Sequence, residues 1–492
     1  MVEFARLEAA AIAPRVASGE WRAAAVIESS LARIEQREPD LAAFLALDRE
    51  GARARAAELD RRRDAGERLG RLAGVPFAVK DNLAVAGRPL TCGSRALAGF
   101  VAPTTATAVE RCLAEDAVLV GQTNMDEFAM GSSCENSAFQ RTRNPWNRER
   151  VPGGSSGGSA AIVAAGAVPF ALGSDTGGSV RQPAAFCGVV GLKPSYGRIS
   201  RSGLVAFASS LDQIGTITRS VTDAALLLEI LAGVDERDAT TVDLPVPPFA
   251  ERLESGLGGI RIGILDEIRE SQLEPAAREI WRSAVARLEG LGASIHPVSV
   301  PGLESAIAAY YVIATAEASA NLARFDGIRY GGRVAAPTLR ETYAKSRGAG
   351  FGSEVKRRIM LGTHALSSGY YEEYYGRARD VVASLRREFD TAFERVDLIA
   401  TPTTPGTAFP LGDRAADPLA MYLSDVFTTP ANLAALPAIA LPSGLDADGL
   451  PFSLQLMADR FQEVPMLAAA RAFERDLGFE VRPALEEASD AA

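Results

Sequence analysis

The chain has 492 residues, of which 47% are hydrophobic, 23% are charged and 7% are aromatic. This is the composition of a folded globular protein, and it excludes the collagenous and intrinsically disordered classes. The net charge of −10 makes the surface as a whole unsuited to nucleic acid, so we expect no DNA binding and only local or partner-mediated contact with RNA.

The first 70 residues have the patterns of helices. Apolar residues recur at near-helical spacing between residues 18 and 38, and residues 48–67 form a second, highly charged helical pattern. We therefore expect residues 1–70 to form an N-terminal helical segment that packs on the core.

From residue 71 onward, short apolar runs alternate with helical patterns. Buried strands are predicted at residues 74–79, 117–121, 168–172 and 188–192, and helices at residues 106–116 and 157–166. This alternation indicates an α/β fold in which helices cover both faces of a sheet.

The second half of the chain continues this alternation. Strands are predicted at residues 260–265, 294–298, 397–400, 437–441 and 452–456, and helices at residues 274–291, 304–324, 352–393 and 464–477. The proline-rich stretch 243–248 is the best candidate for a linker, but strand patterns continue on both sides of it. We expect one large α/β domain over residues 71–480, with a helical excursion near residues 240–395, and a C-terminal tail over residues 481–492.

The cysteines and apolar runs indicate the cellular compartment in which we expect the protein. Cys92, Cys112, Cys134 and Cys187 contain no C-x-x-C pair, which argues for reduced thiols and against a zinc site or a disulfide framework. The N-terminal stretch has no continuous apolar segment, and the longest apolar run, residues 160–172, is shorter than the roughly 20 residues of a membrane span. We expect a cytoplasmic protein with no membrane segment and no metal.

Two glycine-serine stretches, VPGGSSGGS at residues 151–159 and GSDTGGSVRQP at residues 173–183, are the strongest local signals. One short helix and one strand separate them, so both can meet at one edge of a sheet and line one cleft. Neither stretch has the lysine of a P-loop or the spacing of a dinucleotide fingerprint, so we do not expect them to bind nucleotide phosphates.

Residues 153–157 match G-x-S-x-G, the nucleophile elbow of α/β-hydrolases. That elbow needs a strand directly before the serine, whereas residues 148–152 are polar and end in proline. It also needs a histidine, and the chain has only His296 and His364. A second short match, S-x-x-K at residues 353–356, lacks the companion motifs of penicillin-binding enzymes.

With histidine scarce, the other base able to activate a serine is a lysine that burial keeps neutral. Lys80 directly follows the apolar run 75–79, at the end of a predicted strand. The alternative is that Lys80 and Asp81 form an exposed turn.

Residues 74–220, which contain both glycine-serine stretches, resemble the amidase signature family, whose members hydrolyse amides with a Ser-cisSer-Lys triad. The resemblance implies the amidase-signature fold, a large mixed β-sheet covered by helices on both faces. It places Lys80 as the base, Ser155 as the cis serine that relays the proton and Ser179 as the nucleophile. The backbone N–H groups of Thr176, Gly177 and Gly178 would then stabilise the oxyanion.

Motifs spread over nearly the whole chain resemble the family of A subunits of tRNA-dependent amidotransferases. These motifs are NMDEFAM (124–130), RNPW (143–146), GLVAFASSLDQ (203–213), RFDGIR (324–329), EVKRRIMLGT (354–363) and SSGYY (367–371). The chain departs from this family at Cys134, where threonine is usual, at Ser202, where an aromatic residue is common, and at Ala435, where the family has glycine. None of these departures affects the three predicted catalytic residues.

This second resemblance implies a glutaminase that supplies ammonia for converting Glu-tRNA(Gln), Asp-tRNA(Asn) or both to the amidated aminoacyl-tRNA. Arg358 and Asp425 would hold the carboxylate and ammonium groups of glutamine, and Tyr310 would form a pocket wall. The B and C subunits of a heterotrimeric complex would be the partners, with ATP and Mg on a partner, no cofactor in this chain, and tRNA bound mainly by the partner. The alternatives are a stand-alone amidase for another small amide and a non-catalytic scaffold protein, and the intact triad residues argue against the scaffold.

Overall fold

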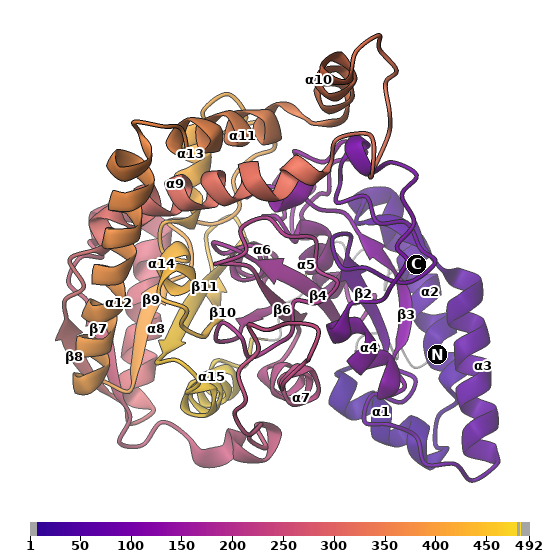
Figure 1. The fold of residues 1–492 in the computed structure, drawn as a ribbon. Coiled ribbons are helices and arrows are strands. Elements are labelled where there is room, and N and C mark those ends of the chain that lie inside the picture. Colours follow the sequence, from indigo (N-terminus) through magenta and orange to yellow (C-terminus); the bar gives the residue numbers. More distant parts are fainter. Residues whose placement is uncertain (1–6, 480–482, 484–492) are drawn as a thin grey trace.

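The structure is a computed structural model that describes residues 7–479 and residue 483. An eleven-stranded sheet runs through it, in the order β1-β3-β2-β4-β6-β5-β10-β11-β9-β7-β8 (Figure 1). The strands are β1 Phe44–Leu47, β2 Pro76–Lys80, β3 Val118–Thr123, β4 Phe170–Asp175, β5 Val190–Lys193, β6 Gln213–Thr218, β7 Arg261–Leu265, β8 Ser294–Val298, β9 Leu398–Pro402, β10 Ala438–Leu445 and β11 Pro451–Ala458. Except for residue 483, the predicted tail at residues 481–492 lies outside the described residues.

The sheet is mixed. Strand β2 runs parallel to both β3 and β4, and β7 runs parallel to both β8 and β9. The remaining pairs are antiparallel, including β4 with β6 and β10 with β11. The predicted α/β class with a large mixed sheet is therefore confirmed.

Helices cover the sheet on both faces. Every residue of β2, β3, β4, β5, β6, β9 and β11 is buried, although neighbouring side chains on a strand point to opposite faces. The α-helices are α1 Ala9–Ser18, α2 Ala23–Leu41, α3 Arg49–Asp64, α4 Thr107–Ala114, α5 Gly157–Ala164, α6 Arg181–Cys187, α7 Val221–Leu231, α8 Pro275–Gly290, α9 Leu303–Asn321, α10 Leu339–Gly350, α11 Ser353–Ala365, α12 Arg377–Arg395, α13 Pro418–Tyr422, α14 Thr429–Leu433 and α15 Glu463–Leu477.

The N-terminal helices are held by buried carboxylates on other elements. The side chain of Asp60, on α3, accepts hydrogen bonds from the first two amides of α2, at Ala23 (2.9 Å) and Ala24 (3.1 Å). Asp223, on α7, does the same for α1, at Ala9 (2.7 Å) and Ala10 (2.9 Å). Helix N-termini carry unsatisfied N–H groups and partial positive charge, so each carboxylate fixes where its helix begins.

Three of the differences from the predicted elements concern a divided helix, a loop and a strand. The helix predicted over residues 352–393 is divided, because α11 ends at Ala365 and α12 begins at Arg377, and Gly369 between them has a φ of +92°. The second glycine-serine stretch is only partly a loop, because its first residues extend β4 and its last residues begin α6. Strand β6 was not predicted, because its alternating polar residues Gln213, Thr216 and Thr218 are buried under the covering helices.

Candidate active site

Lys80 is the last residue of β2, and Ser174 and Asp175 end the neighbouring strand β4. The two strands run parallel, so their carboxyl ends meet at the same edge of the sheet. Lys80 and Ser174 are both buried there, with exposed fractions of 0% and 2%. The sheet therefore brings an amine and a hydroxyl group to one site that water does not reach.

Ser155 reaches this site from the loop that precedes α5, and its peptide bond with Gly154 is cis. Lys80 Nζ donates a hydrogen bond to Ser155 Oγ over 2.7 Å, and Ser155 is completely buried. A Cβ atom at position 154 would lie 2.0 Å from Asp126 Oδ2, so the loop can approach this carboxylate only with glycine there.

Lys80 Nζ makes two further contacts, both with strand β4. It lies 2.9 Å from Ser174 Oγ and 3.3 Å from the Ser174 carbonyl oxygen, and Asn82 Nδ2 donates to the same Oγ over 2.9 Å. Burial lowers the pKa of Lys80 to about 8, although the negative charges of Asp126 and Asp175 act in the opposite direction. A substantial fraction of this lysine is therefore neutral at slightly alkaline pH.

Ser179 lies in the second glycine-serine stretch, and its carbonyl oxygen accepts a hydrogen bond from the amide of Ser156 over 3.1 Å. This contact joins the two stretches directly beside Ser155. Within residues 7–479, Ser179 Oγ forms no hydrogen bond, and Ser179 has an exposed fraction of 9%. Its hydroxyl group is thus free to meet a ligand.

Asp175 organises the loop that carries Ser179. Its carboxylate accepts a hydrogen bond from the amide of Gly178 and pairs with Arg181, both at 2.9 Å. Burial alone would raise the pKa of Asp175, but the charge and hydrogen bonds of Arg181 hold it below its ordinary value. Arg181 Nη2 also donates to Asn432 Oδ1 over 2.6 Å, which ties the loop to α14.

Thr176 and Gly177 directly precede Gly178, whose amide donates to Asp175. Thr176 Oγ1 donates to Asp212 over 2.7 Å, and the Gly177 carbonyl oxygen accepts from Thr428 Oγ1, also over 2.7 Å. A Cβ atom on Gly177 would lie 2.6 Å from Cζ of Tyr310. The missing side chain therefore lets the Tyr310 ring lie against this loop, where a pocket wall was predicted.

Arg358 lies on α11 with an exposed fraction of 3%. Its Nε donates to Glu354 Oε1 over 2.7 Å, and its guanidinium carbon lies 5.2 Å from the ring centroids of both Tyr311 and Tyr422. Within residues 7–479, its two Nη groups donate to no acceptor. These groups can bind an anion.

Asp425 is buried, and Ser132 Oγ donates to its Oδ2 over 2.5 Å. Its other oxygen, Oδ1, has no hydrogen-bond partner within the described residues. Burial raises the pKa of Asp425 to about 7, and the nearby charge of Arg358 acts in the opposite direction. A buried carboxylate oxygen of this kind is stabilised when it receives a cation.

The two histidines lie in other surroundings. His296 Nε2 contacts Ser294 Oγ at 3.0 Å, and His364 packs against the rings of Tyr370 and Tyr374. Residues 148–152 also form no strand before Ser155. The structure therefore does not form the nucleophile elbow that the G-x-S-x-G match would require.

Sequence reasoning gave no role to several polar residues of this region, among them Asn82, Ser132, Ser174, Glu354 and Tyr422. Glu354 could have been found, because it precedes Arg358 by four residues on a predicted helix, the spacing of an ion pair. Asn82 and Ser132 belong to no pattern, since the folded chain alone brings them to the site.

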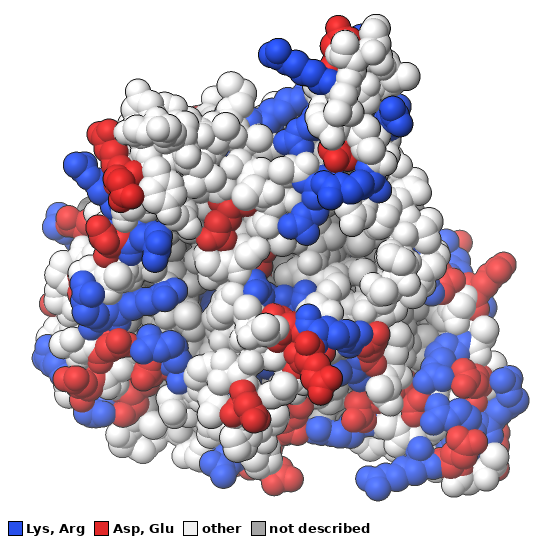
Figure 2. All heavy atoms as spheres, viewed as in Figure 1, with Lys and Arg blue, Asp and Glu red and all other residues white. Residues whose placement is uncertain are grey.

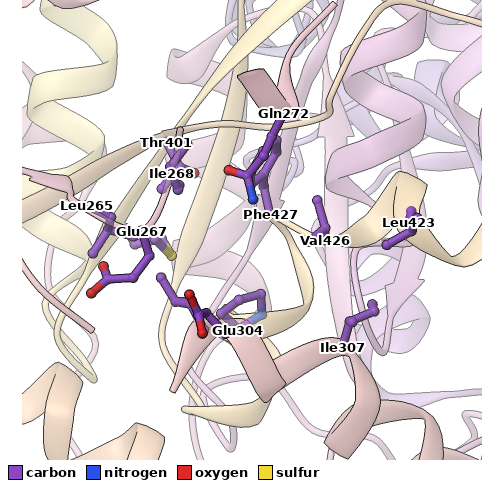
Figure 3. Close-up of a pocket in the computed structure, with 13 residues that line it drawn as sticks. Leu265, Glu267, Ile268, Gln272, Glu304, Ile307, Thr401, Leu423, Val426 and Phe427 are labelled. Atoms are coloured by element: carbon purple, nitrogen blue, oxygen red, sulfur yellow. The ribbon is translucent and has the colours of Figure 1, made fainter. Parts of the chain in front are cut away.

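A separate cavity of about 240 Å³ lies beside the candidate site, near the ends of β7 and β9 (Figure 3). Its mostly apolar lining includes Leu423, Val426 and Phe427, whose segment also carries Asp425. None of the three predicted triad residues lines this cavity. The segment thus contributes a carboxylate to the candidate site and apolar side chains to the cavity.

The described residues contain neither a metal-binding cluster nor a membrane-spanning helix. Within residues 7–479 and 483, no three His, Cys, Asp or Glu side chains are grouped so that they could hold a metal ion. Among the helices of the same residues, none combines the length and apolar character needed to cross a bilayer.

Comparison with known proteins gives concordant results. The family model described as Amidase matches residues 25–467. The chain is 55% identical over 465 residues to the glutamyl-tRNA(Gln) amidotransferase A subunit of Moorella thermoacetica, with 94% of each chain covered. The crystal structure of the glutamyl-tRNA(Gln) amidotransferase A subunit from Thermotoga maritima aligns with a TM-score of 0.80 and 42% identity, and covers 97% of this chain and 96% of that chain.

A third similar structure belongs to a bacterial aryl acylamidase, described as one of the amidase signature enzymes. It aligns with a TM-score of 0.83 and 29% identity, over 95% of this chain and 96% of that chain. The family model covers most of the sequence, and relatives match it over nearly their whole length. The chain belongs to the amidase family.

Proposed function

We propose that this chain is the glutaminase component of a tRNA-dependent amidotransferase. It hydrolyses glutamine to glutamate and ammonia, and the ammonia amidates Glu-tRNA(Gln), Asp-tRNA(Asn) or both. The observation that carries the proposal is the buried 2.7 Å contact between Lys80 Nζ and Ser155 Oγ, beside the loop of Ser179. The 55% identity to the A subunit of such an enzyme supports this choice within the family.

Acylation begins with Lys80 in its neutral form. Its lone pair takes the proton of Ser155 Oγ while Ser155 takes the proton of Ser179, and Ser179 Oγ attacks the carboxamide carbon of glutamine. The amides of Thr176 and Gly177 stabilise the oxyanion, because that of Gly178 already donates to Asp175. Ammonia leaves with the proton that returns through Ser155, and a glutamyl ester of Ser179 remains.

Deacylation uses the same groups. Water attacks the ester carbonyl, and its proton passes through Ser155 to Lys80. Ser179 then recovers a proton by the reverse path as glutamate leaves. The lysine begins and ends the cycle neutral, so no net charge is left in the buried site.

The substrate is held by charges of opposite sign. The free Nη groups of Arg358 bind the α-carboxylate, and the unpartnered Oδ1 of Asp425 binds the α-ammonium group. Tyr310, which lies against Gly177, forms the wall between these groups and the nucleophile loop. An amide without both charges would leave the Nη groups of Arg358 or the Oδ1 atom of Asp425 without a partner, so the site favours a free amino acid.

The partners in this proposal are the B and C subunits of a heterotrimer. One of these two partners would hold ATP and Mg and bind the mischarged tRNA, while this chain needs no cofactor of its own. We place the complex in the cytoplasm, away from membranes and DNA. Residues 1–70, which also contribute β1 to the sheet, would pack on one domain, residues 71–480.

The second candidate is a stand-alone amidase for another small amide. The similarity to the aryl acylamidase favours this candidate. That enzyme has the same fold, and its name describes hydrolysis of aryl amides without any tRNA. The Arg358 and Asp425 pair discriminates between the two, since an uncharged aryl amide would satisfy neither side chain.

Ser179→Ala tests the proposed function, in the chain prepared together with its B and C subunits. We expect glutamine hydrolysis to fall by a factor on the order of 10⁴ or more, because the nucleophile is lost. Transamidation supplied with free ammonia should continue, because that chemistry lies on the partner. Ammonia release and amidated tRNA are the two measured products.

Ser30→Ala is the matched control. Ser30 is fully buried on α2, where its Oγ donates to the Ala167 carbonyl oxygen over 2.7 Å. It should keep glutaminase activity close to that of the wild type. Glutaminase activity that persists in Ser179→Ala, or a wild-type complex that hydrolyses aryl amides but not glutamine, would contradict the proposed function.

A further inference from the structure

Ser174 has no assigned role, yet it makes two of the three contacts of the Lys80 amine. Its Oγ lies 2.9 Å and its carbonyl oxygen 3.3 Å from Nζ, while Ser155 Oγ lies at 2.7 Å. All three side chains are at least 98% buried, so water does not replace any of these partners. The amine is surrounded by three oxygen atoms, two of which belong to one residue.

The protonation state of Lys80 determines how many hydrogen-bond acceptors its amine needs. An ammonium group has three N–H donors, and each can be directed to one of the three oxygen atoms. A neutral amine keeps two N–H donors and gains one lone pair. The Ser174 carbonyl oxygen can only accept; it lies within reach of one Lys80 N–H in either state, and Ser156 Oγ donates to the same oxygen over 3.2 Å.

The Ser174 hydroxyl group is constrained by Asn82. The Asn82 amide nitrogen can only donate, and its 2.9 Å hydrogen bond occupies one lone pair of Ser174 Oγ. The second lone pair can accept the other N–H of Lys80. When both N–H groups point at Ser174, the third position on Nζ points at Ser155.

We propose that Ser174 is a positioning residue that holds two N–H groups of Lys80 throughout the reaction, so that the exchangeable position always faces Ser155. This inference rests on the proton relay of the proposed function. Ser174 forms no bond with the substrate and transfers no proton. Asn82 supports it by fixing the hydroxyl group.

Ser174→Ala removes one acceptor and leaves the carbonyl oxygen. The amine can then rotate about its Cε–Nζ bond, and its lone pair leaves the direction of Ser155 for part of the time. A positioned base contributes about 10²–10⁴-fold to a rate, so we expect the variant to react about 10 to 100 times more slowly. Ser174→Thr keeps the oxygen and should stay within about threefold of the wild type on the same basis.

The pH dependence gives a second, independent signature. The ammonium form needs three acceptors and the neutral form only two, so loss of Ser174 Oγ disfavours the ammonium form. The acid limb of the pH–rate profile should therefore move to lower pH in Ser174→Ala. The other groups that affect Lys80, which are Asp126, Cys134, Asp175 and Asp212, are unchanged in this variant.

The experiment measures how fast a fluorophosphonate probe phosphonylates Ser179 Oγ, with loss of fluoride, in the full chain between pH 6 and 10. The wild type, Ser174→Ala, Ser174→Thr and Ser30→Ala are compared, and a thermal melt of each reports folding. Slow labelling of Ser174→Ala with a shifted acid limb, together with recovery in Ser174→Thr, is the expected result.

Labelling of Ser174→Ala at the wild-type rate would overturn the proposal. So would equal slowing in both Ser174 variants with an unshifted acid limb, because that result indicates only a structural role. The probe is independent of the natural substrate. A wild type that labels but does not hydrolyse glutamine would contradict the proposed function, and the Ser174 comparison would still decide this inference.

Discussion

At the scale of single residues, the surroundings of Lys80 decide what it can do. A lysine acts as a base only when it is neutral, and complete burial lowers its pKa to about 8. Arginine in the same place would keep its charge at every pH that the protein survives. A side chain that has only the charge and length of lysine therefore cannot act as the base at position 80.

Lys80→Arg should be as inactive as Lys80→Ala, with less than about 1% of wild-type glutaminase activity, since the base contributes about 10²-fold or more. In the wild type, kcat/KM should fall as the pH drops through about 8, because protonation of Lys80 removes the base. A pH series of initial rates for the three proteins measures both effects.

His296→Ala and His364→Ala are controls for this series, and both should keep most of the activity. A loss on the order of 10⁴-fold in either variant would instead indicate a histidine relay. Substantial activity of Lys80→Arg between pH 6 and 9 would show that Lys80 is not the base and contributes only its positive charge.

At the scale of elements, the turn between α14 and β10 contains an unusual backbone conformation. Ala435 has a φ of +62°, in the left-handed region that disfavours residues with a Cβ atom. Its carbonyl oxygen still accepts a hydrogen bond from the amide of Tyr196 over 3.3 Å, so the turn cannot relax freely. This is a position at which the resemblance to A subunits leads us to expect glycine.

Ala435→Gly should stabilise the protein by about 1 kcal/mol, because glycine adopts this conformation without the steric cost. Catalytic rates should stay unchanged, since the backbone hydrogen bonds of Ala435 are with Asn432 and Tyr196, and neither is a proposed catalytic or substrate-binding residue. Denaturant unfolding of the two proteins measures the difference, and a less stable Ala435→Gly would contradict the reasoning.

The elements that the sequence predicted well are those with a simple local cause. Residues 294–298 form β8 and residues 275–290 form α8, within a residue or two of the prediction, and the apolar residues of α8 recur at helical spacing. Strand β6 and helix α6 were missed, since their burial comes from distant elements. The break between α11 and α12 also lacks a strong local signal, because one glycine in a helical pattern is often tolerated.

At the scale of the whole molecule, the face shown in Figure 2 mixes charges of both signs. Lys and Arg side chains intermingle with Asp and Glu over the face shown in Figure 2, and the chain as a whole carries a net charge of −10. Phosphate backbones are bound mainly through clustered cations. We therefore expect the chain to depend on a partner for tRNA.

Alone, the chain should bind tRNA with a Kd weaker than about 10 μM at about 150 mM salt, in the range of non-specific binding. The complex with B and C subunits should bind the same tRNA much more tightly. Fluorescence anisotropy of labelled tRNA measures both affinities, and tight binding by the isolated chain would contradict the assignment of tRNA to the partner.

Some residues of the candidate site could be predicted from the sequence, and others could not. Lys80, Ser155 and Ser179 belong to recognisable patterns, and the structure places Lys80 and Ser155 in contact beside the loop of Ser179. Asn82 and Ser132 carry no such pattern, because only the three-dimensional fold brings them to the site. The engagement of the Gly178 amide by Asp175 is also a feature of loop geometry, which residue types do not reveal.

The candidate site draws on two separate stretches of the chain. The groups proposed to break the bond lie between residues 80 and 179, whereas those proposed to select the substrate lie between residues 310 and 425. The stretches meet through contacts such as the hydrogen bond from Ser132 Oγ to Asp425. Mutations in the later stretch can therefore change which amide is recognised while the hydrolytic chemistry is inherited intact, so one ancestral scaffold can give rise to enzymes with unrelated substrates.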